Sequence, residues 1–213
     1  MYKYILFDLD GTLTNPGVGI TNSVMYALRK FNIDVTDRTS LYKFIGPPLR
    51  ESFETFYGFS SEESELAVKY YREYYSERGL YENEVYDGIE NLLIELKKQG
   101  KILIVATSKP EAFAVRILEY FKLHEYFEFT AGATMDNTRN EKADIIKYAL
   151  QSCHIVGKSS VVMVGDRKHD VLGAKENGLD SIGVLFGYGN YDELKNAGAT
   201  FIAEKPGDVL GYV

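Results

Sequence analysis

The stretch Phe7-Asp8-Leu9-Asp10-Gly11-Thr12-Leu13-Thr14 begins with the last residue of the apolar run Tyr4–Phe7. A short, continuous apolar run of this kind is typical of a strand that is buried on both faces of a sheet. Asp8 and Asp10 are two residues apart, so on an extended strand end their side chains point the same way, and Gly11 permits the turn that follows. The stretch therefore predicts a buried strand that ends in a pair of aligned carboxylates.

Further apolar runs follow along the chain, with helical patterns between most of them. The runs are Ile102–Ala106, Phe127–Ala131, Val161–Val164 and Ile182–Leu185, and the helical patterns are Ile89–Gly100, Pro110–Phe121, Lys142–Leu150 and Asp170–Asn177. Strands that alternate with helices at this spacing predict an α/β fold, with a Rossmann-like parallel sheet and helices on both of its faces.

The segment after the first strand differs, because about 70 residues pass without a convincing strand. It offers helical patterns at Thr21–Phe31, Arg50–Tyr57 and Glu62–Arg78, and Ser60 with Glu63 forms a capping box before the last of them. A crossover between parallel strands usually needs far fewer residues. We therefore expect an α/β core domain of residues 1–14 and 86–213, with a helical cap domain, residues 15–85, inserted between them. The many aromatic residues of the insertion fit either a helical core or a surface that closes over a substrate.

Polar side chains end three of the apolar runs. Asp8 and Asp10 follow the first run, Thr107-Ser108-Lys109 follows the second, and Asp166-Arg167-Lys168-His169-Asp170 follows the fourth. In an open parallel sheet, ligands bind at the carboxyl ends of the strands, so we expect these residues to meet there. Carboxylates gathered at one edge repel each other, and a hard divalent cation such as Mg²⁺ offsets that repulsion. A helix-capping role fits any one of these acids but not all of them together.

The same residues contain the parts of a phosphoryl-transfer site. One carboxylate of the Asp8 and Asp10 pair can attack phosphorus while the other, partly protonated, handles a proton. An aspartyl-phosphate intermediate divides one difficult displacement into two easier ones. A Thr107 or Ser108 hydroxyl would donate a hydrogen bond to the phosphoryl oxygens, and a lysine would offset the charge of the transition state.

Taken in this order, these motifs resemble those of the haloacid dehalogenase-like hydrolase superfamily. Asp8-Leu9-Asp10-Gly11-Thr12-Leu13 is similar to the first motif in its phosphatase form, Thr107-Ser108-Lys109 to the second, and Gly165-Asp166-Arg167-Lys168-His169-Asp170 to the fourth. The inserted helical segment resembles the cap of the family, so the resemblance covers the whole chain. Phe44-Ile45-Gly46-Pro47-Pro48-Leu49 is similar to the cap of phosphoglycolate phosphatase-like members. Arg139-Asn140-Glu141-Lys142 resembles bacterial members assigned as 5′-nucleotidases.

The resemblance implies a role for each matched residue. Asp8 is expected to be the nucleophile, and Asp10 the general acid and then the base for the hydrolytic water. Magnesium would be held by the Asp8 carboxylate, the Asp10 main-chain carbonyl and Asp166, with Asp170 supporting a bound water. Thr107 would bind the phosphate.

The family also has a third motif, which contains a lysine. The sequence matches this motif less clearly than it matches the other three. We assign Lys142, which directly precedes the helical pattern Ala143–Leu150, although the Lys-Pro pair frequent in the family is absent here. Lys109 belongs to the second motif and is expected, with Ser108, to support the site or contact the substrate. Arg50 flanks the Gly-Pro-Pro turn of the cap, where it can meet an anionic leaving group or cover a solvated surface.

Composition narrows the choice of partner and compartment. The chain has 24 Lys and Arg against 31 Asp and Glu, a formal net charge of −7. This balance disfavours nucleic acid or an anionic membrane as the main partner, and no apolar run is long enough to span a membrane. The single cysteine, Cys153, cannot form an internal disulfide, so we expect a cytoplasmic protein. The expected partner is a small phosphorylated substrate, and a monomer or a homodimer fits equally well.

The leading interpretation is a magnesium-dependent phosphomonoesterase similar to phosphoglycolate phosphatase. The first alternative is a 5′-nucleotidase on the same scaffold, and the next is a phosphomutase, which returns the phosphoryl group to its substrate. A non-enzymatic phospho-acceptor, similar to a signalling receiver domain, would leave Asp10 and the helical insertion without a role. The sequence does not name the substrate, because specificity in this design depends on cap side chains.

Overall fold

The structure is a computed structural model that describes residues 1–136 and 138–213. Within these residues the chain divides into two units, one of Met1–Thr14 with Val85–Val213 and the other of Asn15–Glu84. The second boundary lies one residue before the end of the cap that the sequence predicts.

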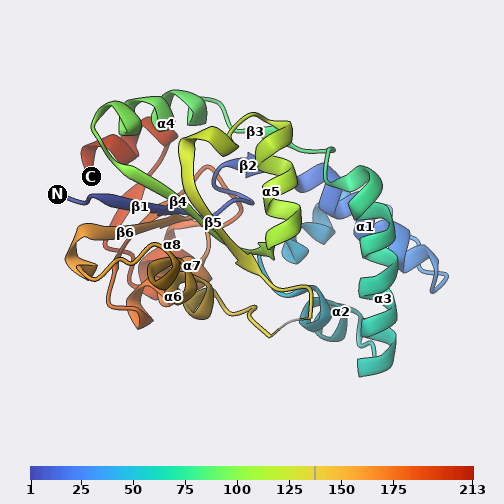
Figure 1. Ribbon diagram of the computed structural model, residues 1–213. Coiled ribbons are helices and arrows are strands. Elements are labelled where there is room, and N and C mark those ends of the chain that lie inside the picture. Colours follow the sequence, from blue (N-terminus) through green and yellow to red (C-terminus); the bar gives the residue numbers. More distant parts are fainter. Residues whose placement is uncertain (137) are drawn as a thin grey trace. The chain divides into compact units, whose positions relative to one another are not determined.

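Six strands among the described residues form one parallel sheet in the first unit, in the order β5-β4-β1-β6-β7-β8 (Figure 1). They are β1 (Tyr4–Phe7), β4 (Ile102–Pro110), β5 (Phe127–Ala133), β6 (Val161–Gly165), β7 (Asp180–Val184) and β8 (Phe201–Ala203). The predicted α/β fold with a parallel sheet is confirmed. Two further strands of two residues each, β2 (Thr14–Asn15) and β3 (Glu84–Val85), pair with each other.

Helices cover both faces of this sheet. Their bounds are α4 (Ile89–Lys98), α5 (Glu111–Tyr120), α6 (Lys142–Ser152), α7 (Lys168–Glu176) and α8 (Tyr191–Ala197), with short 3₁₀ helices at His124–Tyr126, Lys158–Ser160 and Pro206–Gly211. Figure 1 shows α4 and α5 on one side of the sheet and α6 and α7 on the other. None of the helices in the described part of the chain is both long and apolar enough to cross a bilayer.

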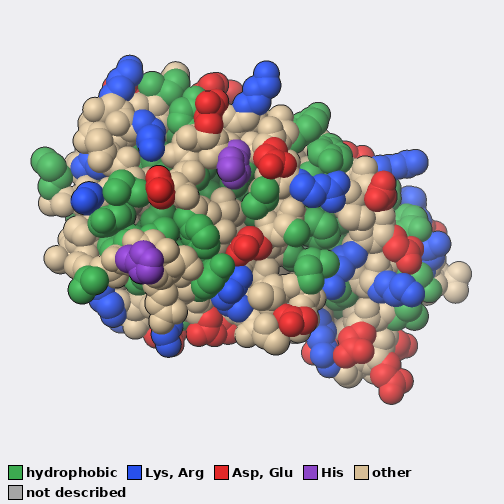
Figure 2. Space-filling model, viewed as in Figure 1, with side chains coloured by type: hydrophobic (Ala, Val, Ile, Leu, Met, Phe, Trp, Pro, Cys, Tyr) green, Lys and Arg blue, Asp and Glu red, His purple; other side chains and the backbone are tan. Residues whose placement is uncertain are grey.

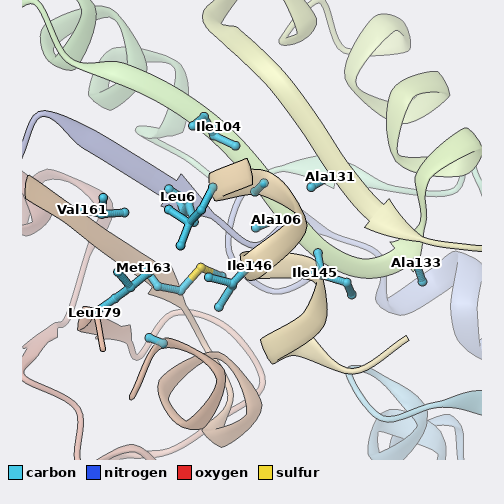
Figure 3. Packing of buried hydrophobic residues seen from close by; sticks show 13 residues of the cluster. Leu6, Ile104, Ala106, Ala131, Ala133, Ile145, Ile146, Val161, Met163 and Leu179 are labelled. Carbon is cyan, nitrogen blue, oxygen red and sulfur yellow. The ribbon is translucent and has the colours of Figure 1, made fainter. Parts of the chain in front are cut away.

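One cluster of buried hydrophobic residues lies between the sheet and α6. Alternate strand residues, among them Leu6, Ile104 and Met163, point to this side and pack against Ile145 and Ile146 of α6 (Figure 3). All five side chains are fully buried. Because the strands are apolar on both faces, the central part of the sheet is anchored firmly, and its strand ends are held in fixed positions.

The register of the central strands brings their carboxyl ends to one level. Phe7, the last residue of β1, pairs with Val105 of β4 and Val164 of β6. The Asp8 N–H then donates a hydrogen bond of 2.9 Å to the Val164 carbonyl. The residues that follow these three positions therefore emerge next to one another, as the strand-end argument predicts.

The second unit is helical. It contains α1 (Gly17–Arg29), a 3₁₀ helix (Arg38–Phe44), α2 (Leu49–Tyr57), α3 (Ser61–Tyr74) and a π-helical turn (Tyr75–Gly79). The predicted capping box is confirmed, since the Glu63 N–H donates to Ser60 Oγ and the Ser60 N–H donates to the Glu63 carboxylate. Phe44 and Phe53 are buried with their ring centroids 5.0 Å apart, so part of the aromatic content forms the core of this unit.

The last helix of this unit is shorter than its sequence pattern predicts. The pattern runs to Arg78, but α3 ends at Tyr74 and the chain continues as the π-helical turn. Gly79 lies against Gly19 of α1, and a Cβ at either glycine would collide with the backbone of the other. The backbones of α1 and the π-helical turn are therefore in direct contact, a tertiary constraint that helical periodicity does not reveal.

Candidate active site

Asp8 and Asp10 occupy the turn that follows β1. The N–H groups of Leu13 and Thr14 both donate to the Leu9 carbonyl, which closes this turn. Gly11 has φ of +82°, and a Cβ there would collide with the Asp166 carboxylate. Glycine is thus required at this position for both backbone conformation and space.

The two aspartates have different partners. Asp8 Oδ1 accepts a hydrogen bond of 2.8 Å from the Leu9 N–H and lies 3.0 Å from Lys142 Nζ. Asp10 Oδ2 lies 2.6 Å from Lys109 Nζ, while its Oδ1 is buried with no hydrogen-bond partner among the described residues. Burial raises the pKa of Asp10 and outweighs the opposing effect of Lys109. Asp10 is therefore the carboxyl of this pair that is suited to hold a proton.

Three buried carboxylates gather beside Asp8. One oxygen each from Asp8, Asp166 and Asp170 lies within 4.8 Å of the others. Burial, with the nearby charges of Asp170 and Asp8, raises the pKa of Asp166 to about 8. Burial also raises the pKa of Asp170 to about 6, although Lys142 opposes the shift. Oxygen ligands and mutual repulsion of this kind fit a hard divalent cation such as Mg²⁺.

Lys142 is the buried cation of this cluster. Its Nζ lies 2.7 Å from Asp170 Oδ1 and 3.0 Å from Asp8 Oδ1, and it donates to the Ala106 carbonyl at 3.1 Å. Burial alone would lower the pKa of Lys142, but Asp170 and Asp8 outweigh it and keep the pKa above its ordinary value. The ammonium group therefore stays charged against two carboxylates.

The position of Lys142 is set by neighbouring backbone. It is the first residue of α6, and Gly173 of α7 packs so closely that a Cβ there would crowd Lys142 Cγ. The Asn177 side chain donates to the Ala143 carbonyl at 2.9 Å and joins α7 to the start of α6. These contacts fix the direction in which the long lysine side chain enters the site.

The end of β4 supplies the second motif. Thr107 is buried, and its Oγ1 accepts a hydrogen bond of 3.3 Å from the Lys109 N–H. Ser108 lies between them and is partly exposed. The structure thus connects Thr107, through the backbone of Lys109, with the Lys109–Asp10 ion pair. Binding of phosphate or substrate by these three residues stays a prediction.

Arg50 lies in the helical unit. Its guanidinium contacts Glu54 Oε1 and Glu65 Oε1, each at 3.2 Å, and it donates to Ser61 Oγ. All four side chains belong to Asn15–Glu84, so the substrate-binding role given to Arg50 stays a prediction. The two glutamates balance the charge of Arg50, and these side chains are far more exposed than Lys109, Lys142 and their aspartate partners.

Two groups that donate hydrogen bonds to Asp166 are not among the site residues that the sequence predicts. The Tyr188 N–H donates to Asp166 Oδ2 at 2.7 Å, and Thr12 Oγ1 donates to Asp166 Oδ1 at 3.4 Å. A Cβ at Gly187 would collide with Asp166, so the loop after β7 approaches this acid closely. The glycines of Phe186-Gly187-Tyr188-Gly189-Asn190 indicate a loop at the site, but a backbone donor has no signature in residue type.

Residues 5–184 match the family model described as haloacid dehalogenase-like hydrolase. The chain is 46% identical over 194 residues to a 5′-nucleotidase of Pseudomonas aeruginosa, covering 91% of this chain and 87% of that protein. It is 40% identical over 201 residues to the tyrosine-protein kinase PtkA of Mycobacterium tuberculosis, covering 94% and 68%. It is 28% identical over 221 residues to a phosphoglycolate phosphatase of Vibrio cholerae, covering 99% and 96%.

The fold has close matches among solved structures. The crystal structure of a predicted phosphatase from Clostridium acetobutylicum superposes with a TM-score of 0.96 at 49% sequence identity. The match covers 100% of this chain and 98% of that one.

Proposed function

The chain belongs to the haloacid dehalogenase-like hydrolase family and is a phosphatase of that family, and we propose that it is a magnesium-dependent phosphomonoesterase that acts through a phosphorylated Asp8. The observation that carries this proposal is the contrast between the two aspartates of the first motif. Asp8 faces a charged lysine and two further carboxylates, whereas Asp10 has a raised pKa and one buried oxygen that has no hydrogen-bond partner in the described part of the chain.

Asp8 supplies the nucleophile in this mechanism. Its Oδ1 accepts from the Leu9 N–H and faces Lys142, which leaves Oδ2 as the attacking oxygen. The bond from Asp8 to phosphorus forms as the bond from phosphorus to the leaving oxygen breaks. Lys142 stays charged and limits repulsion between the Asp8 carboxylate and the anionic ester.

Asp10 moves the protons. Its protonated carboxyl gives a proton to the leaving oxygen in the first step, with Oδ2 held by Lys109. In the second step the carboxylate takes a proton from the water that attacks phosphorus, and inorganic phosphate and free Asp8 are released. A raised pKa allows one side chain to act first as acid and then as base.

Asp8, Asp166 and Asp170 are the side chains that would hold magnesium, and the family resemblance adds the main-chain carbonyl of Asp10. Bound Mg²⁺ supplies positive charge that offsets the meeting of two anions during attack. The Tyr188 N–H and the Thr12 hydroxyl keep the Asp166 carboxylate oriented.

Two substrate classes have support. Nucleoside monophosphates are favoured by the relative named 5′-nucleotidase, which is 46% identical over most of both chains. Phosphoglycolate is supported by the cap motif Phe44–Leu49 and by a relative of that name at 28% identity. Both are small phosphate monoesters, and both fit the proposed chemistry of Asp8 and Asp10.

The nature of the partner is also part of the proposal. Acidic and basic side chains are interspersed on the face seen in Figure 2, and the formal net charge is −7. Both observations support a small phosphorylated substrate rather than nucleic acid or a membrane surface. We keep the cytoplasm as the proposed compartment and a monomer or homodimer as the proposed assembly.

The experiment is a panel of phosphate esters assayed for inorganic phosphate in the presence of Mg²⁺. It includes nucleoside monophosphates, 2-phosphoglycolate, sugar phosphates and phosphotyrosine, with Asp8→Asn as the control protein. We expect release from at least one class by the wild type and none by the variant. No release from any ester would overturn the proposal.

The alternatives give different products in the same assays. A phosphomutase would yield an isomerised phosphate ester without a matching release of phosphate. A non-enzymatic phospho-acceptor would take up one phosphoryl group without turnover. Because one relative is named a tyrosine-protein kinase, a further assay supplies ATP and a tyrosine-containing peptide and measures phosphotyrosine, which we expect to be absent.

A further inference from the structure

An ion pair joins the two chain segments that carry the lysines of the site. Glu111 is the first residue of α5 and lies two residues after Lys109. Arg139 lies three residues before Lys142. Arg139 donates from a terminal guanidinium nitrogen to Glu111 Oε2 at 3.1 Å, although the two residues are 28 positions apart in the chain.

Arg139 makes further contacts besides its ion pair with Glu111. Its Nε donates to the Gly132 carbonyl at 3.0 Å, and its guanidinium carbon lies 3.6 Å from the ring centroid of Tyr148 on α6. Its backbone also exchanges hydrogen bonds with Thr134, at 3.0 Å and 2.9 Å. A planar guanidinium can make two directed hydrogen bonds and stack on a ring at once, which a lysine ammonium cannot do.

Glu111 is held equally closely. The oxygen that accepts from Arg139 also accepts the Gly132 N–H at 3.1 Å. A Cβ at Gly132 would crowd the backbone of Glu111, so β5 and the start of α5 are in direct contact here. Glu111, Gly132 and Arg139 thus connect the end of β4, the strand β5 and the segment that leads into α6.

This connection matters because both site lysines make short contacts. Lys109 Nζ lies 2.6 Å from Asp10 Oδ2 and Lys142 Nζ lies 3.0 Å from Asp8 Oδ1. A displacement of either backbone segment by about 1 Å would break such contacts, and misplacement on this scale can cost about 100-fold in rate. The two lysines must therefore be held at fixed positions relative to each other.

We propose that the Glu111–Arg139 ion pair is a positioning clamp that holds the Lys109 and Lys142 segments together, so that Asp10 and Asp8 keep their lysines during the reaction. In this proposal both residues act on the reaction through the backbone segments that carry the lysines, as their contacts with Gly132 and with each other indicate. The clamp rests on the proposed function, because its purpose is to align the acid and the nucleophile of phosphate-ester hydrolysis.

A role in stability alone does not explain this pair. The Arg139 and Glu111 side chains are 22% and 37% exposed, and an ion pair near the surface adds little to the free energy of unfolding. Its loss should therefore change the position of the lysines more than it changes the melting temperature.

The first test is a double-mutant cycle with p-nitrophenyl phosphate and Mg²⁺. Arg139→Gln and Glu111→Gln, each alone, should lower kcat about 10- to 100-fold with a much smaller change in KM. The double variant should be no slower than the slower single variant, since either change opens the clamp. Arg139→Lys should recover part of kcat, because it keeps the charge but loses the second hydrogen bond.

A matched ion pair provides the control. Lys98 and Glu95 on α4 lie 2.7 Å apart in the same unit and are exposed. Lys98→Gln and Glu95→Gln remove the same charges and should leave kcat unchanged. Unchanged kcat in the Arg139 and Glu111 single variants, or additive losses in their double variant, would overturn the clamp.

The second test does not depend on activity. Hydrogen–deuterium exchange of the metal-free protein is measured in peptides covering residues 107–112 and 138–143. Arg139→Gln should speed exchange in 107–112, and Glu111→Gln should speed it in 138–143. Exchange that changes only around the substituted residue would contradict the clamp. If the wild type hydrolyses no ester, the proposed function fails, but this exchange result still decides whether the two segments are coupled.

Discussion

The carboxyl ends of the central strands, called the sheet edge here, carry a cluster of basic and acidic side chains. The helical unit carries another such cluster, and the two clusters differ in burial. At the sheet edge, the Lys142 and Asp170 side chains are 4% and 2% exposed. In the helical unit, Arg50 and Glu54 are 48% and 40% exposed. Burial shifts the pKa values of Asp10, Asp166 and Asp170 at the edge, whereas water screens the exposed cluster. Similar residue types therefore form a buried cluster in one region and an exposed cluster in the other.

The largest expected effect comes from the nucleophile. Asp8→Asn should lower kcat for phosphate release by at least about 1,000-fold, because the amide cannot form the covalent intermediate. Steady-state assays with p-nitrophenyl phosphate and circular dichroism of the same sample provide the measurement. Wild-type kcat in a folded variant would remove Asp8 from the mechanism.

The next largest effect comes from the buried cation. Lys142→Met leaves Asp8 and Asp170 without their shared partner, so kcat should fall about 100-fold or more. The metal-free protein should also lose about 3–5 kcal/mol of unfolding free energy, the usual cost of breaking a buried ion pair. Urea denaturation in EDTA checks the second value, and a change below 1 kcal/mol would show that the three groups are not coupled as described.

The stability of the metal-free protein should depend on pH through the carboxyl group of Asp166. Its pKa is about 8 in the folded protein against an ordinary value of 3.8, so between these values the folded protein holds a proton that the unfolded chain has lost. The stability of the metal-free wild type should therefore fall as the pH rises from about 4 to 8. Asp166→Asn removes this loss, and its melting temperature in EDTA at pH 8 should exceed that of the wild type by about 3 °C or more.

The same variant tests the metal site. Mg²⁺ should raise the melting temperature of the wild type, because it binds the folded state, and should raise that of Asp166→Asn much less. Differential scanning fluorimetry with and without Mg²⁺ gives both shifts. An equal shift in the two proteins would place the cation elsewhere.

The smallest effect is expected at the exposed cluster. Arg50→Gln should change the free energy of unfolding by less than about 1 kcal/mol, because Arg50, Glu54 and Glu65 are solvated. Its KM for the best ester of the panel decides the predicted substrate contact. A raised KM with unchanged kcat supports a substrate contact, and an unchanged KM assigns Arg50 to the surface.

Sequence reasoning located the central strands and the acidic cluster for one physical reason. Buried parallel strands need continuous apolar runs, and the polar residues that end them must meet at one edge. Asp8 and Asp166 could be found in this way because register aligns β1 with β6. The edge strand β8 (Phe201–Ala203) and the short helix α8 (Tyr191–Ala197) were missed, because three and seven residues carry too little periodicity.

The unpredicted parts of the site depend on backbone groups and on contacts distant in sequence. The Tyr188 N–H reaches Asp166 from 22 residues away, and any residue other than proline could supply it. The Glu111–Arg139 pair spans 28 residues on two different segments. Neither contact follows from local spacing, so only the folded arrangement reveals them.

The most direct test of the mechanism uses Asp10→Asn, which keeps Asp8 but removes the base for the hydrolytic water. The variant is mixed with p-nitrophenyl phosphate and Mg²⁺, quenched in acid and examined by mass spectrometry. Its leaving group departs readily without a proton, so the first step should proceed and the second should stall. We predict one added phosphoryl group on the peptide that contains Asp8. An unmodified Asp8 during phosphate release, or a phosphoryl group on another residue, would contradict the mechanism.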